Sequence, residues 1–173
     1  MRKDIENAKE LGMNGIVLGL LDRKSRIDVA RTRELVEVAR PLRVTFHRAF
    51  DLSQLGLQAL EAVIQTGAER LLTSGGRAKA AEGLATLAGL VGEAKGRIIV
   101  MPGGGITLAN VLRIVRATSA REIHGSLLTP ELRQVAEGEQ RSAQIELYYQ
   151  RVLKVSSVLR GLDPLSMGEL QTD

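Results

Sequence analysis

Residues 44–51 read Val-Thr-Phe-His-Arg-Ala-Phe-Asp (VTFHRAFD), and this is the most informative stretch of the chain. Residues 43–47 predict a strand that ends in polar side chains able to do chemistry, and a helix start follows directly. One of the two histidines of the chain, His47, lies at that junction. A strand of this kind followed by a helix is one βα unit of a parallel sheet. The stretch therefore predicts an α/β protein with its chemistry at the carboxyl ends of strands.

The alternation of a short apolar run with a helical pattern continues on both sides of this stretch. Strands are also predicted at residues 15–19, 70–74, 97–101 and 122–126, and helices at 28–39, from 51 or 53 to 67, at 78–94 and at 108–117. Asp28 can cap the first of these helices, and Asp51 or Ser53 can cap the second. The strands recur about every 25 to 28 residues, as in a parallel sheet with helices on its outer face.

Two closures of such a sheet are open, an eight-stranded TIM (β/α)8 barrel and an open doubly wound sheet. No dinucleotide-binding fingerprint follows the first strand, and the regular period favours the barrel. Only five βα units can be counted, so the predicted fold is part of a barrel plus a C-terminal helix.

The length of 173 residues, 44% of them hydrophobic, predicts a single domain over residues 1–173. Within it, residues 1–126 are expected to form the partial barrel and residues 127–142 a loop. Residues 143–161 show apolar side chains at helical spacing and predict an amphipathic helix. This helix is expected to pack on the sheet, with dimerisation as the alternative.

Composition excludes several classes of function. The net charge of +4 is spread along the chain and only 2% of residues are aromatic, so nucleic-acid binding is not expected. The absence of cysteine excludes disulfides and thiolate metal sites. The first residues show no signal peptide, and no apolar run reaches the ~20 residues that span a bilayer. We therefore expect a cytoplasmic protein.

The first candidate site is the polar end of the strand at residues 43–47. His47 is suited to acid-base work or to metal ligation, because its ordinary pKa lies near neutrality. Arg48 can hold an anion with two donors, and Asp51 can orient a neighbour. The alternative is purely structural: His47 bonded to nearby backbone, Arg48 paired with a carboxylate, and Asp51 capping a helix.

Glycine-rich turns follow two other strands. The turn at Gly103, Gly104 and Gly105 can bring backbone amides close to a phosphate or carboxylate, and the turn at Ser74 and Gly75 is a weaker version of it. The alternative is a tight turn that needs glycine for its backbone conformation. Ser126, at the next strand end, and Arg70 complete the candidate ligand-binding residues.

The two histidines could also share a metal ion. His47 and His124 are both expected near carboxyl ends of strands, the face where barrel enzymes place their sites. Joint ligation requires both side chains to lean inward, because metal–nitrogen bonds are near 2 Å.

Several segments together closely resemble the CutC family, whose name comes from copper homeostasis. These segments are Asp4-Ile5 with Ala8-Lys9, residues 12–19 (GMNGIVLG), Ile27-Asp28, residues 44–51 (VTFHRAFD), residues 70–75 (RLLTSG), residues 101–105 (MPGGG) with Asn110, and residues 122–126 (EIHGS). They keep their order and spacing over about residues 1–126.

The resemblance implies a (β/α)8 barrel in which the five strands correspond to the last five of eight. The first three units, and the cysteines of some members, are then missing from this chain. The family is described as copper-binding, but Cu(I) favours sulfur ligands, so binding through thiolates cannot be carried over. The resemblance brings no settled reaction with it.

Three hypotheses follow from the sequence. The first is a CutC-like protein of copper homeostasis, with copper or a small molecule as its ligand. The second is an enzyme for a small phosphorylated or carboxylated substrate, with His47 as acid or base. The third is an inactive truncated fragment. Five barrel strands leave open edges, so self-association into a homo-oligomer is a further expectation.

Overall fold

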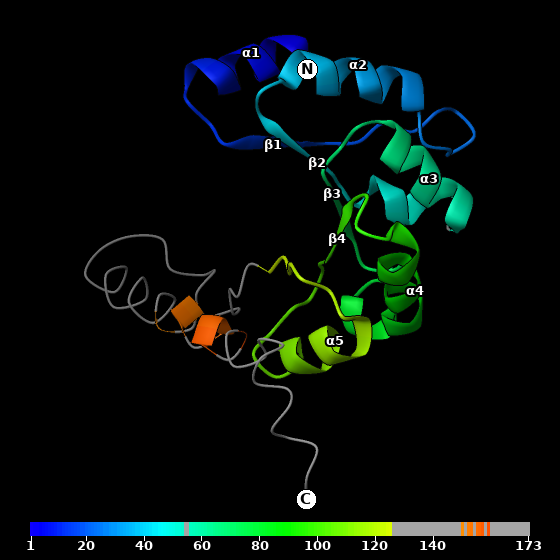
Figure 1. Cartoon of the computed structure of the whole chain (residues 1–173), viewed down its shortest axis with the longest axis vertical. Helices are drawn as coiled ribbons and strands as arrows, with labels where there is room; N and C mark the ends of the chain where they lie inside the picture. The colour runs from blue at the N-terminus through cyan, green and yellow to red at the C-terminus, as the bar shows by residue number, and fades with distance from the viewer. Residues whose placement is uncertain (54–55, 126–149, 151, 154, 158, 160–173) are drawn as a thin grey trace, which may run out of the picture.

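The computed structural model describes residues 1–53, 56–125, 150, 152, 153, 155–157 and 159. Helices and strands alternate along this part of the chain (Figure 1). In chain order they are α1 (Arg2–Glu10), β1 (Gly15–Leu18), α2 (Val29–Ala39), β2 (Arg43–Phe46), the 3-10 helix η1 (Arg48–Leu52), α3 (Leu57–Gln65), β3 (Arg70–Thr73), the 3-10 helix η2 (Ala80–Glu82), α4 (Leu84–Ala94), β4 (Ile99–Pro102) and α5 (Val111–Thr118).

The four strands form one parallel sheet in the order β1-β2-β3-β4. Each strand therefore pairs with the strand next to it in the sequence, as the βα alternation predicts. Four of the five predicted strands are confirmed. The fifth, at residues 122–126, is a correction: its described residues make one parallel bridge, between His124 and Gly103, and form no strand.

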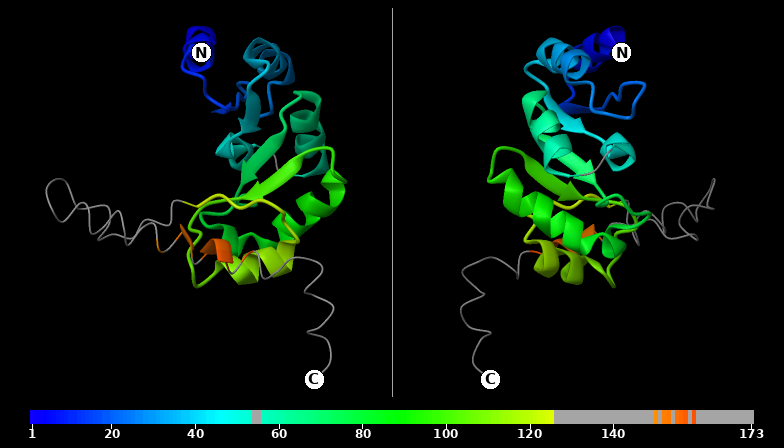
Figure 2. Two further views of the ribbon diagram at one scale, coloured as in Figure 1. Left: turned by 60° about the vertical axis from the view of Figure 1, so that its left-hand side comes forward. Right: turned by 90° about the vertical axis from the view of Figure 1, so that its right-hand side faces the viewer.

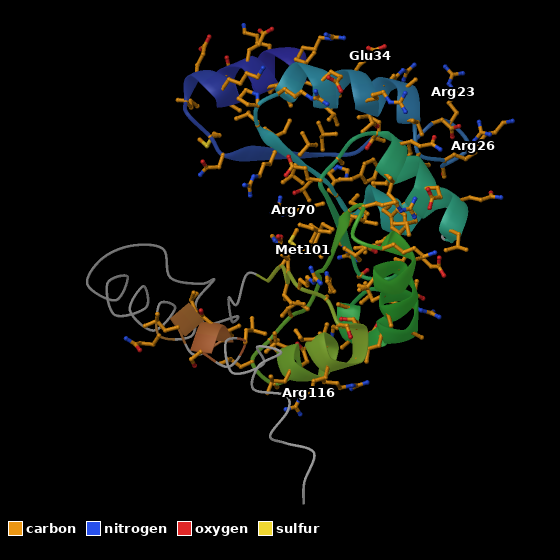
Figure 3. The ribbon with its side chains drawn as sticks, in the orientation of Figure 1. Arg23, Arg26, Glu34, Arg70, Met101 and Arg116 are labelled. Carbon is orange, nitrogen blue, oxygen red and sulfur yellow. The ribbon has the colours of Figure 1, made fainter. Side chains whose placement is uncertain are left out.

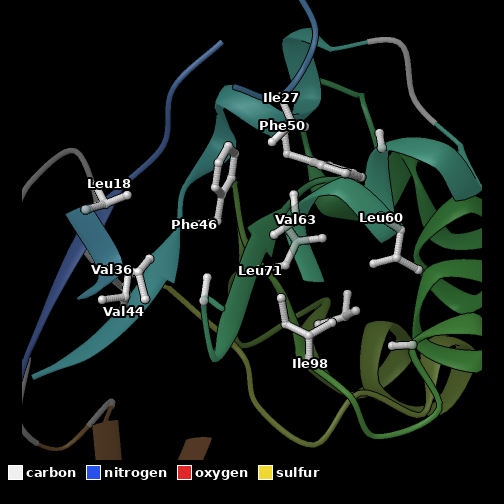
Figure 4. Packing of buried hydrophobic residues seen from close by; sticks show 14 of the residues in the cluster. Leu18, Ile27, Val36, Val44, Phe46, Phe50, Leu60, Val63, Leu71 and Ile98 are labelled. Atoms are coloured by element: carbon white, nitrogen blue, oxygen red, sulfur yellow. The ribbon is translucent and has the colours of Figure 1, made fainter. Parts of the chain in front are cut away.

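One face of the sheet carries the core. Phe46, Leu71 and Val100 lie side by side on β2, β3 and β4 and are buried together with Val44. Helices α2, α3 and α4 cover this face (Figure 2), and Leu60 and Val63 of α3 contribute fully buried side chains to it (Figure 4). Alternation along the strands places the apolar residues against the helices, as the sequence predicts.

The other face of the sheet holds a row of aligned residues across all four strands. Val17, Thr45, Arg70 and Ile99 are in register, and the side chains of this row are exposed or only partly buried. Val17, on the edge strand β1, is 62% exposed. Arg70 and Met101 lie on the side of the sheet away from α3 and α4 (Figure 3). In a closed barrel this face would point to the interior.

The predicted starts of three helices can be compared with the structure, and local hydrogen bonds explain where they differ. Asp28 caps α2 as predicted, accepting a hydrogen bond from the amide of Arg31. Neither Asp51 nor Ser53 caps the next helix, because Asp51 turns toward β3 and α3 begins after Gly56 instead. Helix α4 begins at Leu84 and not at residue 78, because the turn η2 precedes it.

A second hydrophobic cluster surrounds α5. Val111 and Ile114 of this helix pack with Leu87 of α4 and with Ile106. Val155 is buried in the same cluster, and the described residues between 150 and 159 are helical. The predicted loop at 127–142 and most of the predicted helix at 143–161 lie outside the described residues. Within the described part, no helix is long and apolar enough to cross a membrane.

Candidate functional site

His47 lies at the carboxyl end of β2, and its surroundings fix the orientation of its ring. Its amide donates to the carbonyl of Leu18, which continues the β1–β2 pairing by one residue. Its Nδ1 accepts a hydrogen bond of 3.2 Å from the amide of Ala49 at the start of η1. Because Nδ1 accepts, the neutral imidazole carries its proton on Nε2. His47 therefore offers an N–H donor, and no described residue accepts a hydrogen bond from it.

Gly19 makes this position of the His47 ring available. A Cβ added at Gly19 would lie 2.7 Å from Nδ1 and 2.9 Å from Cε1 of His47. Any side chain at this position would therefore displace the ring. Glycine after β1 is required by the close approach of the imidazole from β2.

Arg48 connects the end of β2 to the turn after β3. Its Nε donates to Asp51 at 2.8 Å, and its Nη2 donates to the hydroxyl of Ser74 at 2.7 Å and to the carbonyl of Arg77 at 3.0 Å. Its Nη1 has no acceptor among the described residues and faces Gly104, where an added Cβ would lie 3.0 Å from it. The side chain is 40% exposed, so one edge of the guanidinium is held and the other is open.

Asp51 is a buried acceptor for five donors, and its side chain is 7% exposed. Besides Arg48, it accepts from the hydroxyls of Thr73 (2.5 Å) and Ser74 (2.9 Å) and from the amides of Ser74 and Gly76. Burial acts to raise the pKa of Asp51, but the hydrogen bonds to its charged form outweigh burial and hold the pKa below its usual value. Asp51 is therefore a positioning residue that orders the turn after β3.

The turn after β3 is packed backbone against backbone. Gly75 and Gly76 both adopt positive φ, +72° and +73°. A Cβ at Gly83 would lie 2.2 Å from the carbonyl oxygen of Ser74, and one at Gly75 would lie 2.7 Å from that of Gly83. The hydroxyl of Ser74 accepts from Arg48 and donates within the site, to Asp51 or to the carbonyl of Arg77. Ser74 thus helps to position Arg48.

The glycine turn after β4 lies next to Arg48. Gly103 continues the sheet, since its amide donates to the carbonyl of Thr73. Gly104 and Gly105 adopt φ values of +105° and +67°, and an added Cβ at Gly105 would lie 3.0 Å from the side chain of Lys79. The structure thus brings Arg48, Ser74, Gly75 and the glycine turn together, as the sequence predicts from their strand ends.

Arg70 is placed elsewhere. It starts β3, at the opposite end of the strand from Thr73, and makes a two-point ion pair with Glu122, with distances of 2.7 and 2.9 Å. The hydrogen bonds with Glu122 raise the pKa of the Arg70 guanidinium above its usual value. Arg70 therefore has a carboxylate partner inside the fold, and the structure does not bring it to Arg48 and the glycine turn after β4.

His124 and Ser126 were predicted at the end of a fifth strand. His124 bridges to Gly103, beside β4, so β3 and β4 lie between it and His47 in the sheet. Ligation of one ion by both histidines remains a prediction. Ser126 lies outside the described residues.

Comparison with known proteins identifies the relatives of this chain. Residues 1–129 match the model of the CutC family. The chain belongs to the CutC family. A CutC protein of Xanthomonas campestris pv. campestris (strain B100) is 43% identical over 162 residues, which are 92% of this chain and 68% of the relative. The copper homeostasis protein cutC homolog of Mus musculus is 48% identical over 126 residues, 73% of this chain and 46% of the relative.

A solved structure shows the same architecture. The crystal structure of a protein assigned as the copper homeostasis protein CutC from Streptococcus agalactiae superposes with a TM-score of 0.69 at 30% identity, over 74% of this chain and 63% of that chain. The chain thus spans between about half and two thirds of the CutC proteins it matches. The predicted family and the predicted partial (β/α) barrel are confirmed.

The described residues of this CutC-family chain do not fit a resident copper centre. Cu(I) favours thiolate and thioether sulfur, and the chain has no cysteine, two histidines and four methionines. A histidine bound to metal through Nε2 carries its proton on Nδ1, whereas Nδ1 of His47 accepts a hydrogen bond. Among the described residues, no group of three or more histidine, aspartate or glutamate side chains is placed to hold a metal ion.

Sequence reasoning missed three contributors to the site: Gly19, Thr73 and Lys79. Gly19 had a visible signal, because it is the last residue of the predicted strand next to the one that carries His47. Thr73 and Lys79 had none, because their roles depend on the contacts of Asp51 and Gly105 across the sheet.

Proposed function

We propose that this chain takes part in copper homeostasis as a CutC-family protein. The observation that carries the proposal is the family match over residues 1–129, together with the name of the mouse relative. Because the described residues do not fit a copper centre, we place this role in the handling of copper by the cell and not in a permanently bound ion. Expression of the chain in a bacterial strain that lacks its own CutC gene should restore growth at elevated copper. Unchanged copper sensitivity would contradict the proposal.

Direct copper binding is a separate question, because the sequence predicts His47 and His124 as a pair of ligands. The hydrogen bond at Nδ1 leads us to expect that His47→Ala leaves the affinity for Cu(I) nearly unchanged. An anaerobic competition titration of the chain, His47→Ala and His124→Ala measures this. A tight stoichiometric site that is lost in either variant would instead establish the two-histidine copper site.

The second candidate function is an enzyme for a small phosphorylated or carboxylated substrate. The observation that favours it is the orientation of His47, which leaves an Nε2–H donor at the carboxyl end of β2. A neutral imidazole with its proton on Nε2 can donate a hydrogen bond to a substrate oxygen and stabilise negative charge that develops there. Asp51 positions Arg48 beside it. An inactive fragment, the third hypothesis, would bind neither copper nor a substrate.

The protonated nitrogen of His47 can be measured directly. Long-range 1H–15N correlation at a pH above 8 should show the pattern of a neutral imidazole with its proton on Nε2. Gly19→Ala should change this pattern, because its methyl group would occupy the place of the ring edge. Gly92→Ala serves as the control, since Gly92 does not adopt positive φ and an added Cβ there meets no atom within 4 Å. A proton on Nδ1 in the unmodified chain would contradict the assignment.

The cellular location and the oligomeric state of the chain are proposals as well. We propose a cytoplasmic location and self-association through the open sheet face around Val17, which is 62% exposed. Light scattering of the chain and of Val17→Asp would test the second: a dimer that dissociates in the variant supports it, and a monomer in both contradicts it.

A further inference from the structure

We propose that the glycine turn after β4, together with Arg48 and Lys79, binds the phosphoryl group of a small molecule. We call Gly103–Ile106 the glycine loop. This inference goes beyond copper handling and deepens the second candidate function, the enzyme for a small phosphorylated substrate. A role of the bound phosphoryl group in catalysis rests on that proposed function. The binding site itself does not require His47, so the two can fail separately.

The backbone of the glycine loop has free amide donors, whereas two of its carbonyl acceptors are already hydrogen-bonded. The carbonyl of Gly104 accepts from the amide of Ala80, and the carbonyl of Gly105 accepts from Nδ2 of Asn110 at 2.8 Å. By contrast, the amides of Gly104, Gly105 and Ile106 have no acceptor among the described residues. Successive free amides in a tight turn form a concave site for anions. The loop therefore has the polarity of an anion site.

The shape of the loop is held in place by its neighbours. Asn110 bridges the loop to the start of α5, because its Oδ1 also accepts from the amide of Thr107 at 2.8 Å. The amide of Gly103 fixes the other end to β3. The positive φ of Gly104 and Gly105 is a conformation that other residues rarely adopt. The free amides are therefore presented by a preorganised turn.

Arg48 supplies the first positive charge. Asp51, Ser74 and the carbonyl of Arg77 hold its Nε and Nη2, so its Nη1 is left pointing at Gly104 without an acceptor in the described part of the chain. A guanidinium fixed in this way loses little conformational freedom when an anion binds to the open nitrogen. Asp51 partly offsets its charge, but all of the oxygens of Asp51 are already occupied by donors.

Lys79 supplies a second charge on the other side of the loop. Its side chain lies against Gly105, is exposed, and makes no ion pair among the described residues. Arg77 is exposed on the same turn. The loop and its two basic neighbours together offer three free amides, a guanidinium and an ammonium, a set that suits the several oxygens of a phosphoryl group better than the two oxygens of a carboxylate. We therefore assign the ligand to the phosphate class.

Inorganic phosphate is the first probe of this site. We expect the thermal midpoint of the full chain to rise by about 3 to 5 °C when phosphate is present at roughly ten times its Kd, relative to chloride at the same ionic strength. In 1H–15N spectra the largest shifts should occur at the amides of Gly104, Gly105 and Ile106. The largest shifts at any other place, or no saturable effect of phosphate, would overturn the proposal. Equal affinity for acetate would overturn the phosphate assignment.

Charge variants separate a built site from general attraction to a basic protein. Lys79→Gln should weaken phosphate binding by about three- to tenfold, because one close charge is worth roughly that much at the surface. Lys3→Gln removes the same charge from α1 at the far end of the molecule and should leave the affinity unchanged (Figure 1). Equal weakening in both variants would overturn the proposal.

His47→Ala separates phosphate binding at the glycine loop from the proposed enzymatic function, which requires the imidazole. The variant should keep phosphate binding, because none of the proposed contacts involves the imidazole. Loss of phosphate binding in a folded His47→Ala protein would place the anion at His47 and not at the glycine loop.

Discussion

Replacement of Gly83 by alanine is expected to lower the free energy of unfolding by about 3 kcal/mol, the upper end for inserting atoms into a packed site. The new Cβ would lie 2.2 Å from the carbonyl oxygen of Ser74 and 3.2 Å from Cα of Gly75. Both obstacles are backbone atoms, so no side chain can turn away to make room. Separation of the two segments would disturb the bonds that Asp51 makes to Ser74 and Gly76. Denaturant unfolding followed by circular dichroism measures the loss.

Gly89→Ala is the matched control in the helix that follows Gly83. Gly89 lies on an exposed face of α4, and an added Cβ would meet no atom within 4 Å. Because alanine favours the helix over glycine, we expect this variant to gain about 0.5 to 1 kcal/mol. Equal stability of Gly83→Ala and Gly89→Ala would show that the backbones of Gly75 and Gly83 do not pack as described.

Asp51→Asn is the second change with a large expected effect, again about 3 kcal/mol of destabilisation, because several hydrogen bonds to a charged and buried carboxylate are weakened or lost at once. The amide would keep one acceptor oxygen but present an NH2 group to Nε of Arg48 or to the hydroxyl of Thr73. Thermal and denaturant unfolding measure the stability. The variant should also lose the effect of phosphate, because Asp51 holds the guanidinium toward the glycine loop.

The pH dependence of stability identifies the charge of Asp51 as the cause. Its pKa is lowered in the folded state, so its contribution to stability is complete above the unfolded value of about 3.9 and is lost as the pH falls through the lower folded value. Below that range Asp51→Asn should approach the stability of the unmodified chain. A constant difference between the two proteins from pH 7 to pH 2 would contradict this account.

Much of the fold was predictable, because parallel βα units carry a strong local pattern. The predicted strands at 15–19, 43–47 and 70–74 differ from β1, β2 and β3 by one residue at the carboxyl end. The predicted strand at 97–101 became β4 at Ile99–Pro102, because Arg97 turns back to the carbonyl of Ala94 at the end of α4. The first residues of α4 and α5 were predicted too early in the chain. Hydrogen bonds of side chains and backbone in the preceding turns hold the residues of these turns out of the helices.

The location of the candidate site could be predicted from the sequence, but the contacts between its residues could not. Strand ends that share one edge of a sheet had to bring Arg48, Ser74 and the glycine loop together. Two contacts of the structural alternative are present, the bond of His47 to nearby backbone and the pair of Arg48 with Asp51. Periodicity could not show that Arg70 points to Glu122, because that partner lies 52 residues further along the chain. The chemical roles of these residues remain predictions.

The strand order also bears on how fast the chain folds. The strands that begin at residues 15, 43 and 70 each pair with the next strand along the chain, so each sheet contact closes a loop of one βα unit. The entropic cost of loop closure grows slowly with loop length, and here it is nearly the same for each pair of neighbouring strands because the loops have similar lengths. Folding should therefore proceed by addition of one unit to another from any starting pair, as in repeat proteins.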